Sequence, residues 1–316
     1  MEVRKMYFPY LRGRQFELIA LRELVERKKI GQNIIPIIEP IKPSATLLKT
    51  LECFVKYDRE IAVVFNPAVG DFSKKIREMR REDSKIANEL YELLTKHDRI
   101  IKSYIMNDKI AAKLKKDEFK TEKLIINLNR DCLDDFLEAY EDTFPRYTLI
   151  PDDRAFRRVI SESKVLFEDN FNKRLRNIDY IGHQDEFFSD SHLYFQKEDY
   201  VGFADYSVVG EEFNESGFAP VAVAIHLIYF NKNDELRIHH FVSDSNEGIE
   251  DPAGKFGEAL EKLVSWCEKH NVEKTLGLQG FYDCYNYGKY PGLGTVKKYS
   301  IMHHLELMSN FLGGRQ

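Results

Sequence analysis

Residues 34–66, IIPIIEPIKPSATLLKTLECFVKYDREIAVVFN, contain a complete strand–helix–strand unit. The apolar run at 34–38 has the length of a buried strand. Ser44 then stands where its hydroxyl can cap a helix over residues 45–57. A second apolar run, residues 61–65, follows the helix directly. This stretch therefore predicts two neighbouring parallel strands joined by a helical crossover.

The same rhythm recurs through the first half of the chain. Strands that are apolar throughout, rather than alternating, indicate a sheet covered on both faces. Repeated strand–helix units of this spacing predict a TIM-type (β/α)₈ barrel. A doubly wound open sheet is the alternative, although no Gly-x-Gly-x-x-Gly follows a strand. The expected strands are residues 7–11, 34–38, 61–65, 100–106, 124–128 and 147–150.

The second half of the chain is less regular. Residues 220–230 and 236–242 flank a polar turn and predict an antiparallel β-hairpin in the C-terminal third. Strands seven and eight of the barrel have three candidates, among which the sequence does not choose. We expect one domain over residues 1–316, although the length also suits two medium domains. The strand candidates are residues 178–181, 200–206 and 275–281. Helices are expected over residues 153–172, 251–270 and 300–312. Irregular or inserted segments are expected at about 173–199 and 210–245.

The composition indicates which partners and which cellular compartment to expect. The chain carries 47 basic and 52 acidic residues, a net charge of −5, and so has no general attraction to a phosphate backbone. The basic run at 74–81 is interleaved with acids at helical spacing, which predicts a solvated helix face and makes nucleic acid an unexpected partner. The four cysteines form no Cys-x-x-Cys pair, and no apolar run is long enough for a membrane span. A cytoplasmic protein is expected.

Polar residues follow most of the expected strands. In a barrel, the carboxyl ends of the strands meet at one rim, where function is usually found. One cation, several carboxylates and several amides could bind an anionic or polar ligand there, and Glu39 with Asp152 or Asp205 could hold a divalent cation. The alternative is that these residues form turns, which need Asn and Asp. The strand-end candidates are Arg12, Glu39, Asn66, Asn129, Asp152 and Asp205.

The histidines and one tyrosine-rich segment supply secondary candidates. His303 and His304 lie in the last helical stretch and match no zinc signature. A four-residue turn in the hairpin would place His226 opposite His239. Tyr282 opens the Tyr- and Gly-rich segment 282–294, which we expect to be a surface loop. No catalytic residue and no cofactor follow from these patterns.

The chain resembles the phage beta protein family, and more closely a bacterial branch of that family. The likeness runs from about residue 7 to residue 312. It is carried by YFPYLRGRQFELIALREL at 7–24 and IPIIEP at 35–40, and by the shorter stretches DEFFS at 185–189, GFADY at 202–206 and HHLEL at 303–307. The motif positions so marked are Arg12, Gly13, Gln15, Glu39, Asp205, His303 and His304.

The resemblance implies a genomic setting and no reaction. That setting is prophages and anti-phage defence islands, where such a protein resembles an antidote that restrains a toxic neighbour. The first functional hypothesis is therefore antiviral defence through protein–protein interaction, with a partner encoded nearby and residues 282–290 as the candidate contact. The second is a barrel enzyme acting on a phosphorylated or polar substrate at the strand ends, with metal-assisted hydrolysis as one route. The sequence indicates neither the oligomeric state nor the identity of the ligand.

Two structural expectations follow from the strand-end pattern. Glu39 should lie at the carboxyl end of a parallel strand, on the same face of the barrel as Asn66 and Asp152. If Arg12, Glu39 and Asp205 form a site facing a cleft, truncating them should cost little stability. If they are instead buried ion pairs, truncation should be strongly destabilising.

Overall fold

The computed structural model describes residues 5–141, 143–214 and 220–313, which form two compact units. The barrel unit comprises the described residues within 1–18, 32–169 and 191–206. The second unit comprises those within 19–31, 170–190 and 207–316. This division reflects contacts within the chain, and our expectation of a single domain stays a prediction.

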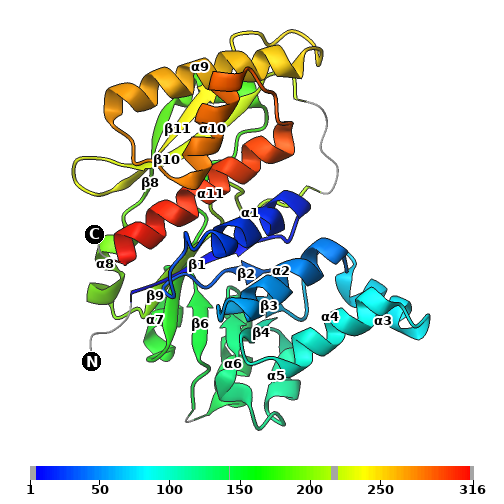
Figure 1. The fold of residues 1–316 in the computed structure, drawn as a ribbon. Coiled ribbons are helices and arrows are strands. Elements are labelled where there is room, and N and C mark those ends of the chain that lie inside the picture. Colours follow the sequence, from blue (N-terminus) through cyan, green and yellow to red (C-terminus); the bar gives the residue numbers. More distant parts are fainter. Residues whose placement is uncertain (1–4, 142, 215–219, 314–316) are drawn as a thin grey trace. The chain divides into compact units, whose positions relative to one another are not determined.

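Eight parallel strands close into a barrel, which confirms the predicted TIM-type fold (Figure 1). The order is β1-β2-β3-β4-β5-β6-β7-β9, and the barrel closes where Pro9 of β1 pairs with Asp205 of β9. As expected, Glu39, Asn66 and Asp152 follow the carboxyl ends of their strands and so belong to one rim. The strands are β1 Met6–Leu11, β2 Ile37–Ile38, β3 Ile61–Val64, β4 Ile100–Ile105, β5 Leu124–Ile126, β6 Tyr147–Ile150, β7 Lys164–Glu168 and β9 Gly202–Asp205.

Aromatic side chains fill the barrel interior near that rim. Tyr10, Phe167 and Tyr206 belong to the buried core cluster of the barrel, with ring centroids 4.7–5.3 Å apart. Because alternate residues of a strand share a face, the inward series Phe8 and Tyr10 continues to Arg12. The rim therefore begins directly above an aromatic layer.

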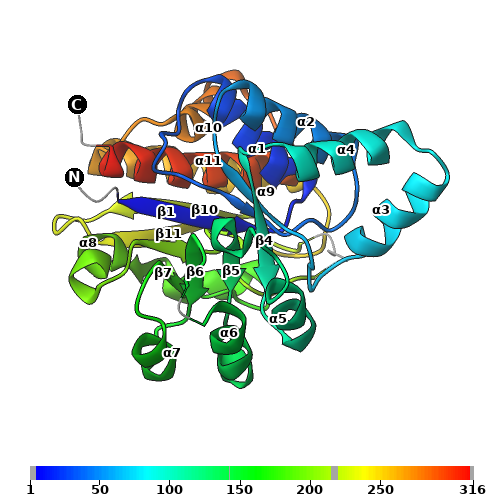
Figure 2. The ribbon, with the colours of Figure 1, turned by 90° about the horizontal axis from the view of Figure 1, so that it is seen from below.

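Helices surround the strands of the barrel, as the crossovers require. Figure 2 shows α5, α6 and α7 on the outer side of β4, β5 and β6. The first helix is α1, Gln15–Glu26, which begins in the barrel unit and continues into the second unit. The other helices of the barrel unit are α2 Ala45–Lys56, α3 Phe72–Arg81, α4 Lys85–Lys96, α5 Asp108–Leu114, α6 Leu133–Tyr140, α7 Arg154–Val159 and α8 Ser191–Tyr194, with short 3₁₀ turns η1 Lys120–Glu122, η2 Arg130–Cys132 and η4 Phe195–Glu198.

The second unit is built on a three-stranded antiparallel sheet in the order β10-β11-β8. Helix α9 packs on β10 and β11, and α11 packs on β10 and α10 (Figure 1). The core between sheet and helices includes Leu227, Phe256, Leu263 and Phe281. Its elements are β8 Asp185–Ser189, β10 Ala224–Phe230, β11 Leu236–Val242, α9 Pro252–His270, α10 Leu276–Tyr287, α11 Leu293–Leu312 and the 3₁₀ helix η3 Asn177–His183.

Strands seven and eight are now assigned, and one expected helix was wrong. Residues 153–172 do not form one long helix: α7 ends at Val159 and β7 begins at Lys164. The helix ends because Ile160, its C-cap, has an extended backbone with φ of −99° and ψ of 100°. The eighth strand is β9, within the candidate range 200–206.

The other two strand candidates and the expected loop were also wrong. Residues 178–181 lie in η3, and residues 275–281 open α10. The Thr275 hydroxyl caps α10 by accepting a hydrogen bond from the backbone nitrogen of Leu278. Helix α10 continues to Tyr287, so only residues 288–292 connect it to α11, and 282–294 is not a loop.

The predicted hairpin is present, with a different register. Five residues, 231–235, separate β10 from β11, rather than four. His226 therefore pairs with His240, and Leu227 pairs with His239. This single-residue difference places His226 and His240 on the same face of the sheet.

Candidate functional site

At the barrel rim, Arg12 and Glu39 are brought together, as the strand-end pattern predicted. Glu39 is fully buried, and Arg12 is 8% exposed. One carboxylate oxygen of Glu39 accepts hydrogen bonds from Arg12 and from the Tyr10 hydroxyl at 2.9 Å. The other oxygen accepts from the backbone nitrogens of Ala68 at 2.6 Å and Val69 at 3.3 Å. Four donors thus occupy this carboxylate, which ties β1, β2 and the turn after β3 together.

Aromatic rings flank the guanidinium of Arg12. Its central carbon lies 5.3 Å from the ring centroid of Tyr10 and 5.2 Å from that of Tyr206, distances typical of cation–π contacts. Burial, and then the charge of Glu39, raise the pKa of Tyr10 well above its usual value. Tyr10, Arg12 and Glu39, which we name the rim cluster, are joined by hydrogen bonds to the buried carboxylate of Glu39. That arrangement favours a role as scaffold.

The remaining strand-end candidates have separate local roles. The Asn66 amide donates to the carbonyl of Ile105 at 2.8 Å and accepts from its nitrogen at 2.9 Å, which joins β3 to β4. Asn129 accepts from the backbone nitrogen of Asp131 and so caps η2. Asp152 pairs with Arg157 at the surface.

Asp205 faces away from the barrel interior. Its neighbours Ala204 and Tyr206 belong to the interior core, so alternation puts Asp205 on the outer side of β9. There it is 2% exposed and accepts a hydrogen bond from the Tyr7 hydroxyl at 2.7 Å. Burial, with Asp205 as the second cause, raises the pKa of Tyr7 well above its usual value. Asp205 is therefore not brought to the rim cluster.

The secondary candidates lie in the second unit. His303 is fully buried between two partners: its Nδ1 lies 2.7 Å from the Thr275 hydroxyl and its Nε2 lies 2.7 Å from the carbonyl oxygen of Ile228. Burial lowers the pKa of His303 to about 4. His304 is buried against the Ser207 hydroxyl, at 2.9 Å. Tyr282 lines a 400 Å³ cavity beside α9. These histidines hold α11 in place.

A chain of hydrogen bonds crosses one face of the antiparallel sheet in the second unit. The Nδ1 atoms of His226 and His240 lie 2.7 Å apart. The Nε2 atom of His240 lies 3.2 Å from a carboxylate oxygen of Glu186, whose other oxygen accepts from Arg174 at 2.6 Å. The ring of Tyr180 packs on both imidazoles, at 4.8 and 4.4 Å between centroids. We name His226, His240 and Glu186 the imidazole chain.

The chemistry of these partners fixes where the protons sit. A carboxylate only accepts, so Nε2 of His240 donates to Glu186. Burial lowers the pKa of His240 to about 4, and burial, with His240 and Lys297 as smaller causes, lowers the pKa of His226 well below its usual value. Both rings are therefore neutral at pH 7. Nδ1 of His240 then accepts from Nδ1 of His226, and Nε2 of His226 keeps its lone pair.

His226 also lines a cavity of 240 Å³ within the second unit, which we name the cationic cavity. Three basic side chains, Lys173, Arg174 and Lys297, line it as well. No carboxylate is among the described residues of its wall, but two of the cations have acidic partners: the amino group of Lys173 lies 3.2 Å from the mostly exposed carboxylate of Glu212, and Arg174 donates to Glu186. A cavity lined by charges of one sign concentrates ions of the other. The imidazole chain thus ends at a place suited to an anion.

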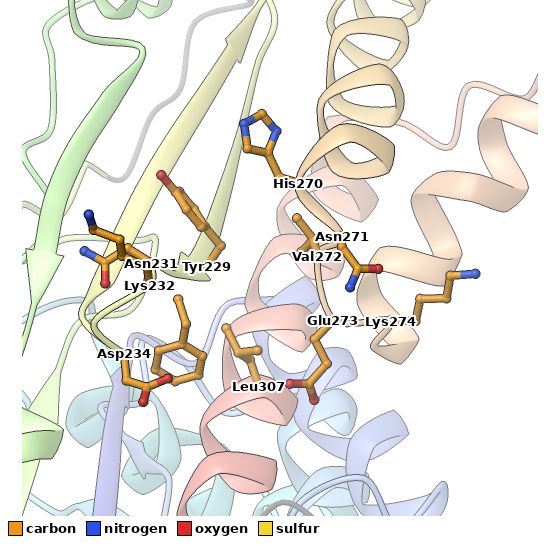
Figure 3. Close-up of a pocket in the computed structure, with 11 residues that line it drawn as sticks. Tyr229, Asn231, Lys232, Asp234, His270, Asn271, Val272, Glu273, Lys274 and Leu307 are labelled. Atoms are coloured by element: carbon orange, nitrogen blue, oxygen red, sulfur yellow. The ribbon is translucent and has the colours of Figure 1, made fainter.

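A larger cavity of 640 Å³ lies between the hairpin end and the residues after α9 (Figure 3). Its charges are of both signs: Lys232 and Lys274 are accompanied by Asp234 and Glu273. In Figure 3 the amino groups of Lys232 and Lys274 extend in opposite directions. Glu273 is engaged by the Asn310 amide at 2.7 Å. This hairpin-end cavity therefore does not gather one kind of charge.

Membrane-spanning helices and clusters of metal ligands were both sought in the described part of the chain. Within residues 5–141, 143–214 and 220–313, no helix combines the length and apolarity needed to cross a membrane. Over the same ranges, no three His, Cys, Asp or Glu residues lie where they could jointly hold a metal ion. The divalent cation considered for Glu39 therefore has no such cluster among these residues.

Sequence reasoning missed the imidazole chain. A signal was present, because His226 stands between Ile225 and Leu227 in an otherwise apolar strand, and Glu186 lies in the DEFFS motif. The pairing with His240 depended on the hairpin register, which the turn length alone did not give.

No protein-family model, curated protein or solved structure matches this chain.

Proposed function

We propose that the protein acts on a small anionic, phosphate-bearing substrate in the cationic cavity of the second unit, with His226 as the acid–base group. The observation that carries this proposal is that one cavity is lined both by three cations and by a neutral imidazole at the end of a hydrogen-bonded chain. A general base needs a free lone pair near the ligand, and the imidazole chain leaves Nε2 of His226 in that form.

The charge and size of the cavity support this class of substrate. Arg174 and two lysines supply the donors that bind phosphate oxygens, with the guanidinium already oriented by Glu186. A volume of 240 Å³ is below the roughly 300–1,000 Å³ of sites for drug-sized ligands. A phosphate group with a short organic portion suits this volume better than a nucleotide.

Anion binding tests the proposal. Isothermal titration with inorganic phosphate and pyrophosphate should give saturable binding that weakens at least about tenfold, or about 1.4 kcal/mol, in Lys297→Ala. Lys232→Ala removes the same charge from the hairpin-end cavity and serves as the matched control. Equal binding by wild type and both variants, or no binding by the wild type, would reject the cationic cavity as the site.

A second candidate function is supported by a different surface. The hydroxyl-bearing rings of Tyr285 and Tyr287, near the end of α10, are 47% and 71% exposed. Tyrosine is favoured at protein interfaces, because it offers a large contact area and a polar tip. This exposure supports a contact with another protein. The prophage- or defence-associated setting, in which the protein would restrain a partner encoded nearby, is what the family resemblance implies, and the cytoplasmic location is the expectation from the composition.

Copurification separates the two candidates. The protein should be coexpressed with each neighbouring gene product, purified by affinity and sized. Replacing Tyr285 and Tyr287 together with serine should abolish a specific complex, while Tyr194→Ser, at an exposed tyrosine of the barrel unit, should leave it intact. If no neighbour copurifies, or if the double variant still forms the complex, the tyrosine surface is not the contact.

A further inference from the structure

The imidazole chain has a second property that concerns the reactive atom of His226. We infer that Nε2 of His226 accepts a phosphoryl group, so that the protein forms a phosphohistidine during its working cycle. This inference rests on the proposed function, since it takes the anion in the cationic cavity to be a phosphoryl donor. In this inference His226 forms a covalent bond to phosphorus, whereas in the proposed function it only transfers a proton.

The geometry selects one nitrogen. Nδ1 of His226 is occupied by Nδ1 of His240 at 2.7 Å, and Nε2 is the ring nitrogen that remains for a ligand. The ring is held by the edge-on packing of Tyr180 at 4.8 Å and Phe171 at 5.1 Å. A nucleophile held in one orientation loses little freedom on reaction, which favours attack on a bound phosphorus atom.

The chain also stabilises the product of the attack. As the bond from Nε2 to phosphorus forms, the imidazole of His226 becomes positively charged. The hydrogen on Nδ1 then shifts toward His240, whose own Nε2 hydrogen is bonded to the carboxylate of Glu186 at 3.2 Å. The positive charge is thus shared along the chain toward an anion, as the orienting carboxylate does for a catalytic imidazolium.

The cations provide the complementary part of the reaction. Arg174 and Lys297 line the same cavity as His226, so they can bind the oxygens of the phosphoryl group while it is transferred. The donor must be small and must carry a good leaving group, as an acyl phosphate or a phosphoramidate does. With phosphoramidate, the bond from phosphorus to the donor nitrogen breaks, and that nitrogen leaves as ammonia with the electron pair of the bond.

Labelling with phosphoramidate tests the inference on the full chain. The purified protein is incubated with phosphoramidate, and its intact mass and peptide map are recorded at neutral and at acidic pH. We expect one added phosphoryl group on His226 that is lost in acid, and none in His226→Gln. His270→Gln, which changes a histidine lining the hairpin-end cavity, should label like the wild type. His240→Gln should still bind phosphate but should label on the order of a hundredfold more slowly.

The outcomes separate this inference from the proposed function. If the wild type binds phosphate but is not labelled, or if the peptide map places the label on another residue, His226 is not the acceptor and only the acid–base proposal stands. If neither binding nor labelling occurs, both proposals fail. Because the decisive observation is the position of the label in the wild type, it does not depend on whether any variant folds.

Discussion

Replacing Arg12 with alanine should destabilise the barrel by about 3–5 kcal/mol, the typical effect of removing one partner of a buried ion pair. Glu39 is fully buried, so its negative charge would remain inside the protein without the guanidinium. Of the four donors to this carboxylate, the hydroxyl of Tyr10 and the backbone nitrogens of Ala68 and Val69 would remain. The contacts of the guanidinium with two aromatic rings would be lost as well.

The assay is urea denaturation followed by circular dichroism, supported by thermal melts. At roughly 2–4 °C per kcal/mol for a domain of 150–250 residues, the melting temperature should fall by at least about 6 °C. Arg157→Ala is the matched control, because the Arg157–Asp152 pair lies on the same barrel, with side chains 39% and 53% exposed. An exposed pair of this kind contributes about 0–1 kcal/mol.

A double variant distinguishes the buried charge from lost packing. Arg12→Met combined with Glu39→Leu removes both charges, and it should recover much of the stability lost in Arg12→Ala. The reasoning is refuted if Arg12→Ala is no less stable than Arg157→Ala. In that event the rim cluster would not be scaffold, and the alternative that these residues serve a site would be favoured.

Three further outcomes test other parts of the structure. Burial holds the pKa of His303 at about 4, against about 6.5 in an unfolded chain. The free energy of unfolding should therefore fall by up to about 3 kcal/mol as the pH falls from 7 to 4, because the unfolded chain binds a proton that the folded protein does not. Urea midpoints should show this fall, and His303→Gln should reduce it. Gly277→Ala should destabilise the second unit, because a Cβ atom there would lie 2.3 Å from the carbonyl oxygen of Tyr299. Gly257→Ala should instead stabilise α9 by up to about 1 kcal/mol, because a Cβ atom there would have nothing within 4 Å. Calorimetry should therefore show melting temperatures that shift in opposite directions in the two variants. Asn66→Ala should cost about 1–3 kcal/mol in the same urea assay, since it removes two hydrogen bonds to Ile105.

The sequence alone determined the barrel, because its evidence is local. Residues 34–66 show a strand, a capped helix and a strand in order, and the Ser44 hydroxyl does cap α2, at 3.1 Å from the backbone nitrogen of Leu47. Repetition of such units leaves few ways to bury both faces of the sheet. The rim position of Glu39 and its proximity to Arg12 followed from the same rule.

Local patterns failed where a short element depends on its surroundings. The strand β7 has five residues, and it is a strand because it is paired between β6 and β9, partners that no window of its own sequence contains. Thr275 can begin a strand or cap a helix, and the packing of α10 on α11 favours the cap.

The candidate site depended most on tertiary structure. One residue of difference in the hairpin turn decides whether His226 faces His239 or His240, because side chains alternate between the faces of a strand. The third member, Glu186, comes from a strand that pairs with β11 from more than forty residues away in the chain, and the cations arrive from two other segments. The sequence supplied these residue types, but only the folded chain decides which of them share a proton, because hydrogen bonds require approach to about 3 Å and spacing along the chain does not determine it.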